Sequence, residues 1–196
     1  MAVIVWDRDD VLLDLTGAWL SYWKRANPGC AVSYRDLTRN PPDEVIGCTR
    51  EEYLASLDAF RLSPEASALP PRREVLEWFR RYGDRHRHLV LSATPKTTAA
   101  AAAAWTFRHF GEWVRSFHIV PSHRAGDREE REREKADYLA WLGKGEILVD
   151  DSRENIDRAS TRGVRGVLFP APWNGASGSI ADALDALTTI ADGVPQ

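Results

Sequence analysis

Two pairs of aspartates each follow a short apolar run in this sequence. Asp7 and Asp9 come after residues 2–6, and Asp150 and Asp151 come after residues 146–149. Carboxylates two residues apart past a strand end can point the same way, and they repel each other unless a cation lies between them or one binds a proton. Because no thiol or imidazole accompanies them, they suit a hard cation, most simply Mg²⁺, with room left for a phosphate.

Such a group of carboxylates can carry phosphoryl-transfer chemistry. One aspartate beside the cation can attack phosphorus and form an aspartyl phosphate, while a second carboxylate protonates the leaving oxygen and later activates water. The phosphoryl oxygens also need hydrogen-bond donors and a cation. Ser92, after the apolar run 88–91, is a candidate donor, and Lys135 is the candidate cation. Lys144 is flanked by two glycines, which predict an exposed turn.

The apolar pattern predicts the elements that must position these residues. Short β-branched runs predict strands at 2–6, 88–91, 117–120, 146–149 and 166–169. Helical spacing predicts helices over 16–25, from 49 onward, and over 72–82, 99–110 and 180–190. The alternation predicts an α/β fold with a doubly wound parallel sheet, whose carboxyl edge gathers the polar residues.

Several segments carry more local expectations. Thr49 and Glu52 have the spacing of a capping box. Residues 63–71, bracketed by Ser63-Pro64 and Pro70-Pro71, are expected to form a loop. The charged run 128–135 is expected to be a solvated helix face with pairs such as Glu129 and Arg133.

Composition restricts the partners. The 196 residues include 26 Lys and Arg against 29 Asp and Glu, a net charge of −3, which argues against a protein that holds nucleic acid by bulk charge. A local basic patch at Arg80, Arg81, Arg85 and Arg87 leaves nucleic-acid ends open as a substrate. The sequence shows neither an apolar run of membrane-spanning length nor a signal-peptide core, and its two cysteines form no disulfide framework, so we expect a cytoplasmic protein.

The same residues, in this order, resemble the haloacid dehalogenase-like superfamily of aspartate-nucleophile phosphatases. Residues 3–12 look like its first motif, 89–92 like the second, Lys135 like the third, and 147–155 like the fourth. The resemblance implies Asp7 as nucleophile and Asp9 as general acid/base. It implies Ser92, Ala93 and Lys135 as phosphate ligands, with Thr94 as the alternative to Ser92 if the loop is shifted by two. It implies Mg²⁺ held by Asp7, the Asp9 backbone carbonyl and Asp150, with Asp151 close by.

The resemblance also suggests a domain division and a subgroup. Ser92 lies 83 positions after Asp9, which leaves room for a small helical cap at 16–70, inserted into a Rossmann-like core of 1–15 and 71–196. The cap position, the Asp-Asp pair and residues 169–174 are most similar to the 5′(3′)-deoxyribonucleotidase-type group. Leu15 stands nearest to the position where that group often carries a base-stacking aromatic residue. Aromatic residues and arginines of the cap could stack on a base or flank a phosphate: Trp19, Tyr22, Trp23, Arg25, Tyr34, Tyr53, Phe60 and Arg61.

The sequence therefore predicts a Mg²⁺-dependent phosphomonoester hydrolase, with a nucleoside monophosphate as one candidate substrate. A phosphatase of another small metabolite, a mutase and a catalytically weak binding or regulatory protein on the same fold stay open, as does a homodimer. A phosphoacceptor receiver domain is disfavoured, because its acceptor aspartate would stand where Ser92 does, and because such domains are shorter.

Overall fold

A five-stranded parallel sheet forms the centre of the protein. The computed structural model describes residues 1–122 and 134–193. In order along the chain, the strands are β1 (Val3–Trp6), β2 (Arg87–Ser92), β3 (Val114–Ile119), β4 (Ile147–Asp150) and β5 (Arg165–Leu168). They lie side by side in the order β3-β2-β1-β4-β5, and each neighbouring pair is parallel. The predicted α/β fold with a doubly wound parallel sheet is confirmed.

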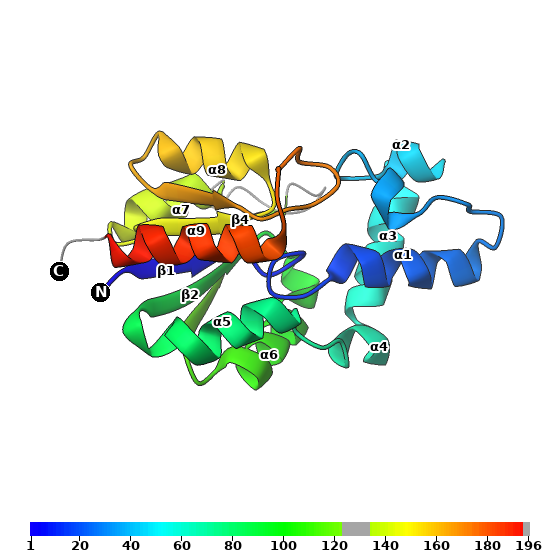
Figure 1. The fold of residues 1–196 in the computed structure, drawn as a ribbon. Coiled ribbons are helices and arrows are strands. Elements are labelled where there is room, and N and C mark those ends of the chain that lie inside the picture. Colours follow the sequence, from blue (N-terminus) through cyan, green and yellow to red (C-terminus); the bar gives the residue numbers. More distant parts are fainter. Residues whose placement is uncertain (123–133, 194–196) are drawn as a thin grey trace.

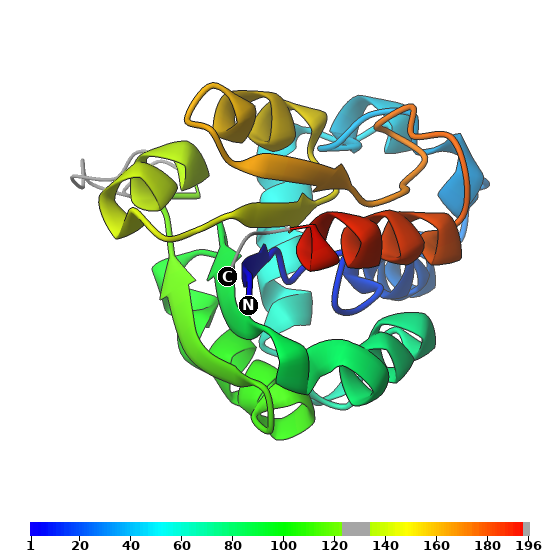
Figure 2. The same cartoon turned by 60° about the vertical axis from the view of Figure 1, so that its left-hand side comes forward.

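Helices cover both faces of this sheet, as Figure 2 shows. One face packs against α5 (Arg73–Tyr82), α6 (Lys96–Phe110) and α9 (Ile180–Asp192). The other face packs against α7 (Lys135–Leu142) and α8 (Arg153–Ser160). The central strand β1 is therefore buried on both sides, with Ile4 and Trp6 in the first layer of apolar side chains and Val5 in the second. This double burial explains why the strands have continuous apolar sequences.

The segment between β1 and α5 forms a group of helices beyond the carboxyl end of the sheet (Figure 1). It contains α1 (Leu15–Ala26), a short 3₁₀ turn (Tyr34–Asp36), α2 (Asp43–Ile46), α3 (Arg50–Arg61) and α4 (Pro64–Ser67). The division into a cap at 16–70 and a core stays a prediction. The predicted capping box is present, because the Thr49 hydroxyl accepts from the Glu52 N–H and the Glu52 carboxylate accepts from the Thr49 N–H.

The expectation of a loop over 63–71 is wrong, because α4 lies within it. Ser63 caps this helix by accepting a hydrogen bond from Ala66 N at 3.1 Å, and Pro64 occupies its first turn. Both residue types favour helix starts as well as turns. Local sequence therefore identified a boundary here but not the turn of helix that follows it.

The chain leaves the sheet and returns to it at one place. The backbone N–H of Arg72 donates to the carbonyl of Leu12 at 2.8 Å, and the Arg72 guanidinium lies 3.4 Å from Asp14, the cap of α1. Asp10 adds a second tie, since its carboxylate accepts from Thr16 N at 2.9 Å and from Thr16 Oγ1 at 2.5 Å. Asp10 does so from the left-handed region, at φ 62°, where asparagine and aspartate are the best tolerated residues after glycine.

Other boundaries differ from the sequence prediction for local reasons. β3 begins at Val114, three residues before the predicted start at 117. A register shift between His88 and Leu89 leaves Arg115 as an extra residue in β3, and this interruption hides the alternating pattern from the sequence. The helix expected over 128–135 is wrong at Glu134, which is extended, and α7 starts only at Lys135. The Glu129–Arg133 pair lies outside the described residues. Within 1–122 and 134–193, the helices lack the combination of length and apolar character that crossing a bilayer requires.

Candidate active site

Three buried carboxylates meet at the carboxyl edge of the two central strands. Asp7 directly follows β1, Asp150 is the last residue of β4, and Asp151 comes next. Because Trp6 pairs with Val149 in the sheet, Asp7 and Asp150 stand level with each other. One oxygen from each of Asp7, Asp150 and Asp151 can be chosen so that all three lie within 4.8 Å of one another. The sheet register thus brings together residues more than 140 positions apart in the sequence.

Lys135 reaches this cluster from the first turn of α7. Its Nζ lies 2.6 Å from Asp7 Oδ1 and 2.6 Å from Asp150 Oδ2, and its side chain is only 3% exposed. Burial by itself would lower the pKa of the ammonium, but the Asp150 and Asp7 carboxylates outweigh burial and raise that pKa above its ordinary value. Lys135 is therefore a permanent cation between two carboxylates.

The carboxylates remain electrostatically crowded in spite of this cation. Burial is the largest cause that raises the pKa of Asp7, to about 7; the neighbouring Asp150 and Asp9 raise it further, while Lys135 opposes them. Burial, followed by the charges of Asp150 and Asp7, raises the pKa of Asp151 well above its ordinary value. Such groups are stabilised as carboxylates when an additional cation binds beside them.

The donor set fits a hard divalent cation. Asp7, Asp150 and Asp151 supply oxygen ligands alone, and their carboxylates are crowded together in the absence of added positive charge.

Neighbouring hydrogen-bond donors fix the orientation of two of these carboxylates. Ser152 N donates to Asp150 Oδ1 at 2.8 Å, and Trp173 Nε1 donates to Asp151 Oδ2 at 2.7 Å. The site is thus held in shape by the chain itself.

Asp9 lies beside the cluster but has different partners. Its Oδ1 accepts from the guanidinium of Arg8, and its Oδ2 lies 2.7 Å from Nη2 of Arg61, which belongs to α3. Burial works to raise the pKa of Asp9, but the charges of Arg61 and Arg8 outweigh it and hold that pKa below its ordinary value. In this arrangement Asp9 is a carboxylate with a guanidinium on each oxygen. The role of acid that the sequence suggests for Asp9 requires at least one of these arginines to move.

The predicted site residues line one cavity of about 190 Å³. Ser92 and Ala93 line it together with the acidic cluster and Lys135, whereas Thr94 faces a separate small pocket and bonds Thr98 Oγ1 at 2.9 Å. The placement favours Ser92 over Thr94 as the residue beside Asp7. The helices beyond the sheet close the other side of the cavity through Leu15, Thr16, Asn40, Tyr53, Leu57 and Arg61.

Two residues of the site have partners that the sequence did not indicate. Arg61 meets Asp9 from 52 positions away, and Trp173 meets Asp151 from 22 positions away. Asn155 donates to both oxygens of Asp150 at 3.2 Å. It differs from the other two because it lies inside the fourth motif, five positions after Asp150, so its place in the sequence does indicate its partner. Most cap aromatics pack within the cap instead of facing the cavity, as Trp19 does against Tyr53.

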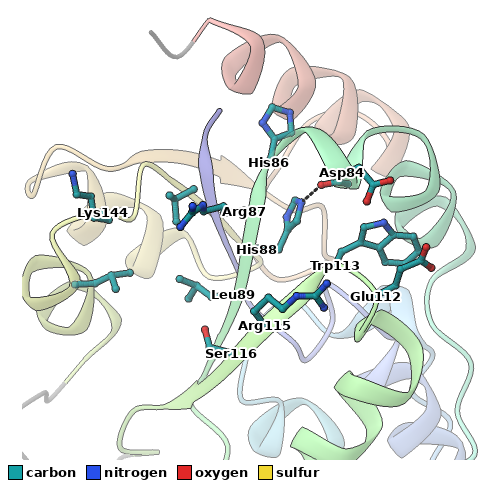
Figure 3. Close-up of a pocket in the computed structure, with 13 residues that line it drawn as sticks. Asp84, His86, Arg87, His88, Leu89, Glu112, Trp113, Arg115, Ser116 and Lys144 are labelled. Carbon is teal, nitrogen blue, oxygen red and sulfur yellow. Dashed lines mark hydrogen bonds between the residues drawn. The ribbon is translucent and has the colours of Figure 1, made fainter. Parts of the chain in front are cut away.

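A second and larger cavity, of about 500 Å³, lies at the opposite edge of the sheet (Figure 3). Arg87, Arg115 and Lys144 are exposed around it, and Trp113 and His88 line it from the side of α5. Of the predicted basic patch, only Arg87 lines this cavity, at the edge of the sheet opposite to the carboxylates. Lys144 is exposed, as predicted, in a segment without regular secondary structure.

Comparison with solved structures identifies the fold. A haloacid dehalogenase-like family hydrolase from Streptococcus pneumoniae superposes with a TM-score of 0.64 at 9% identity, covering 96% of this chain and 98% of the other. A HAD-superfamily hydrolase of subfamily IA, variant 1, from Geobacter sulfurreducens gives 0.55 at 14% identity over 95% and 99%. A HAD family hydrolase from Deinococcus radiodurans, solved with bound phosphate and sodium, gives 0.55 at 16% identity over 95% and 88%.

These likenesses show that the chain has the haloacid dehalogenase-like fold that the sequence motifs suggested. No family model matches the sequence, and no curated protein matches it either. The structural neighbours do not single out the deoxyribonucleotidase-type group, so that part of the resemblance stays a prediction.

Proposed function

We propose that this protein is a Mg²⁺-dependent phosphomonoester hydrolase that works through an aspartyl phosphate on Asp7. The observation that carries the proposal is the contact of buried Asp7 with Lys135, inside a cavity that also holds Asp150, Asp151 and Ser92. A nucleophile, a cation and an oxygen-ligand set therefore surround one small space. The neighbour that binds phosphate and sodium on the same fold supports this assignment.

The chain's own residues divide the reaction between them. An oxygen of Asp7 attacks phosphorus as the bond from phosphorus to the ester oxygen breaks, and the leaving oxygen takes a proton from Asp9. Water then attacks the same phosphorus, Asp9 takes up its proton, and the bond to Asp7 breaks to release phosphate. Lys135 and the Ser92 hydroxyl, with the backbone of Ala93, stabilise charge on the phosphoryl oxygens.

The metal would be held by Asp7, the Asp9 backbone carbonyl and Asp150, with Asp151 direct or through water. When bound, it supplies positive charge that draws the phosphate in and neutralises the negative charge on the transferring group. The three carboxylates and the absence of soft ligands from that set favour Mg²⁺ over softer cations.

The size of the cavity favours a small substrate. At about 190 Å³ it lies below the roughly 300–1,000 Å³ of pockets that enclose larger ligands. Leu15 lines the wall where a base-stacking aromatic residue would be expected. A nucleoside monophosphate would need α1 and α3 to move outward, so we rank a nucleotide below a short phosphate monoester.

Turnover of the purified protein tests the proposal. We expect Mg²⁺-dependent phosphate release from p-nitrophenyl phosphate or from a panel of small phosphate esters, a nucleoside monophosphate and a 3′-phosphorylated oligonucleotide, and loss of that release on chelation. Asp7→Asn should reduce turnover by about 10³-fold or more, because it removes the nucleophile. Asp84→Asn is the matched control, since Asp84 is exposed at the opposite edge of the sheet.

Two results would contradict the proposal. Undiminished turnover by Asp7→Asn would exclude Asp7 as the nucleophile. Absence of turnover by the wild-type protein across the whole panel with Mg²⁺ would favour a binding or regulatory role for the same fold.

A further inference from the structure

Arg61 lines the cavity and contacts Asp9, the residue that faces the leaving group in the proposed reaction. Arg61 is the last residue of α3, and Tyr53, Leu57 and Arg61 follow one another at four-residue spacing along the face of α3 that lines the cavity. Asp7 and Lys135 mark the phosphoryl end, and Asp9 lies next to the ester oxygen in the proposed reaction. Because Arg61 contacts Asp9 at 2.7 Å, it borders the group attached to that oxygen.

The two arginines that hold Asp9 differ in how they are fixed. Arg8 belongs to the loop after β1, is 6% exposed, and lies with its guanidinium carbon 5.0 Å from the ring centre of Trp105 in α6. It is therefore anchored to the sheet and its helices. Arg61 comes from the helices beyond the sheet, so it can leave Asp9 while Arg8 stays as the counter-ion of that carboxylate.

Arg61 also has hydrogen-bonding capacity that the protein does not use. Its Nη2 faces Asp9 and its Nη1 lies 3.3 Å from Asp58, but its buried Nε has no hydrogen-bond partner. An arginine carries five N–H donors in a planar fork, and this shape matches a carboxylate through two parallel hydrogen bonds. The cavity wall also carries the apolar side chains of Leu15 and Leu57.

We infer that Arg61 is a specificity-determining residue that binds a carboxylate on the leaving group, so that the preferred substrates are short phosphate esters of hydroxy acids. A carboxylate suits the remaining space better than a second phosphate or a base, because the whole cavity measures about 190 Å³. A substrate carboxylate that pairs with Arg61 also draws this guanidinium away from Asp9, which frees one Asp9 oxygen to face the ester. This inference rests on the proposed phosphatase function.

A pair of substrates of similar size tests the inference. Phosphoglycolate and 2-hydroxyethyl phosphate differ mainly in having a carboxylate or a hydroxyl group beyond the ester. We expect the wild-type protein to prefer phosphoglycolate by about ten-fold or more in kcat/KM, the range for a charge-assisted hydrogen bond. In Arg61→Gln that preference should fall to within two-fold, mostly through a higher KM for phosphoglycolate, whereas Arg61→Lys should retain part of it.

Arg50→Gln provides the matched control, because Arg50 lies on the same helix but pairs with Asp43 on the exposed side. Its substrate ratio should equal that of the wild type. Comparing ratios within each variant removes any common effect of altered folding. A wild-type ratio near one, or an unchanged ratio in Arg61→Gln, would overturn the inference while leaving the hydrolase function in place.

A binding measurement separates the inference from the hydrolase proposal. If the wild-type protein turns over neither ester, the hydrolase function fails, and thermal shifts with each ester in the presence of Mg²⁺ then decide the inference. A larger shift with phosphoglycolate that disappears in Arg61→Gln supports carboxylate recognition by Arg61. Equal shifts with the two esters, or no shift with either, contradict it.

Discussion

The two edges of the sheet show that cavity size and convergence of charge are separate properties. The amino edge has the larger cavity, about 500 Å³ against 190 Å³, but its cationic side chains Arg87, Arg115 and Lys144 are exposed to water. At the carboxyl edge, Asp7, Lys135 and Asp150 are at most 9% exposed, and Lys135 lies 2.6 Å from each of the two carboxylates. Water screens the first set of charges, whereas buried charges act on each other at short range.

The difference follows from the topology. In a parallel sheet the loops after neighbouring strands all open at the carboxyl edge, so residues from β1, β2 and β4 converge there. The cavity at the amino edge is instead lined by turns that lead into strands, and its one buried titratable side chain in the described lining, His88, is satisfied within the fold. His88 accepts from Trp6 Nε1 at 3.0 Å and donates to the Gly83 carbonyl at 2.9 Å.

Removal of Lys135 should show the largest contrast between the two edges. Lys135→Met leaves buried Asp7 and Asp150 without their shared cation, so we expect a loss of about 3–5 kcal/mol in the free energy of unfolding at neutral pH. Lys144→Met, at the amino edge, should change it by less than about 0.5 kcal/mol. Urea denaturation of both variants without added metal measures the difference, and equal losses would remove the proposed distinction.

The pH dependence of stability should reveal the neutral His88. Burial lowers the pKa of His88 to about 4 from an ordinary value of 6.5. Between these values the unfolded chain binds a proton that the folded protein does not, so the free energy of unfolding decreases as the pH falls from 6.5 to 4. The His88 contribution is complete above pH 6.5, and its loss amounts to about 3 kcal/mol.

A His88→Gln variant isolates this contribution from that of the carboxylates. Its free energy of unfolding should change less steeply with pH than that of the wild type over the same interval. The difference in slope corresponds to at most one proton taken up on unfolding, the proton that binds His88 in the unfolded chain. Parallel pH curves for the two proteins would show that the pKa of His88 is the same in the folded and unfolded states.

Loss of the Trp173 hydrogen bond should weaken the metal site by a smaller amount. Trp173→Phe keeps an aromatic ring beside Tyr34 but removes the donor to Asp151, and we expect about ten-fold weaker Mg²⁺ or Mn²⁺ binding by calorimetry. Trp141→Phe is the control, because Trp141 is 71% exposed on α7. Unchanged affinity in Trp173→Phe would show that Asp151 does not need this donor or does not bind the metal.

The smallest effect is expected from the amino-edge cations. Substituting Arg87 and Lys144 together by alanine should leave kcat/KM for the best ester within two-fold, since both lie at the edge opposite to Asp7. Steady-state kinetics at two salt concentrations checks this expectation. A large decrease that disappears in high salt would mean that the larger cavity attracts the substrate after all.

Sequence reasoning brought the residues that follow strands to one edge, whereas for residues that arrive from elsewhere it named candidates without their partners. Asp7 and Asp150 stand next to continuous apolar runs, so strand prediction alone brings them to one edge. Lys135 was the candidate cation from the chemistry and from the family resemblance, but nothing near it in the sequence shows which carboxylates it contacts. Arg61 and Trp173 reach the site only through the folding of α3 and of the loop after β5, and such long-range contacts leave no local pattern.

The hydrogen bond from Arg72 to Leu12 has a mechanical consequence. The two chain segments that connect α1–α4 to the sheet are tied together at this point, and Asp14 lies beside the same arginine. The helices beyond the sheet also contact the rest of the protein away from Arg72, through Arg61 and Asp9 and through Trp105 and the Leu69 carbonyl, so any change in their tilt about Arg72 would have to break those contacts.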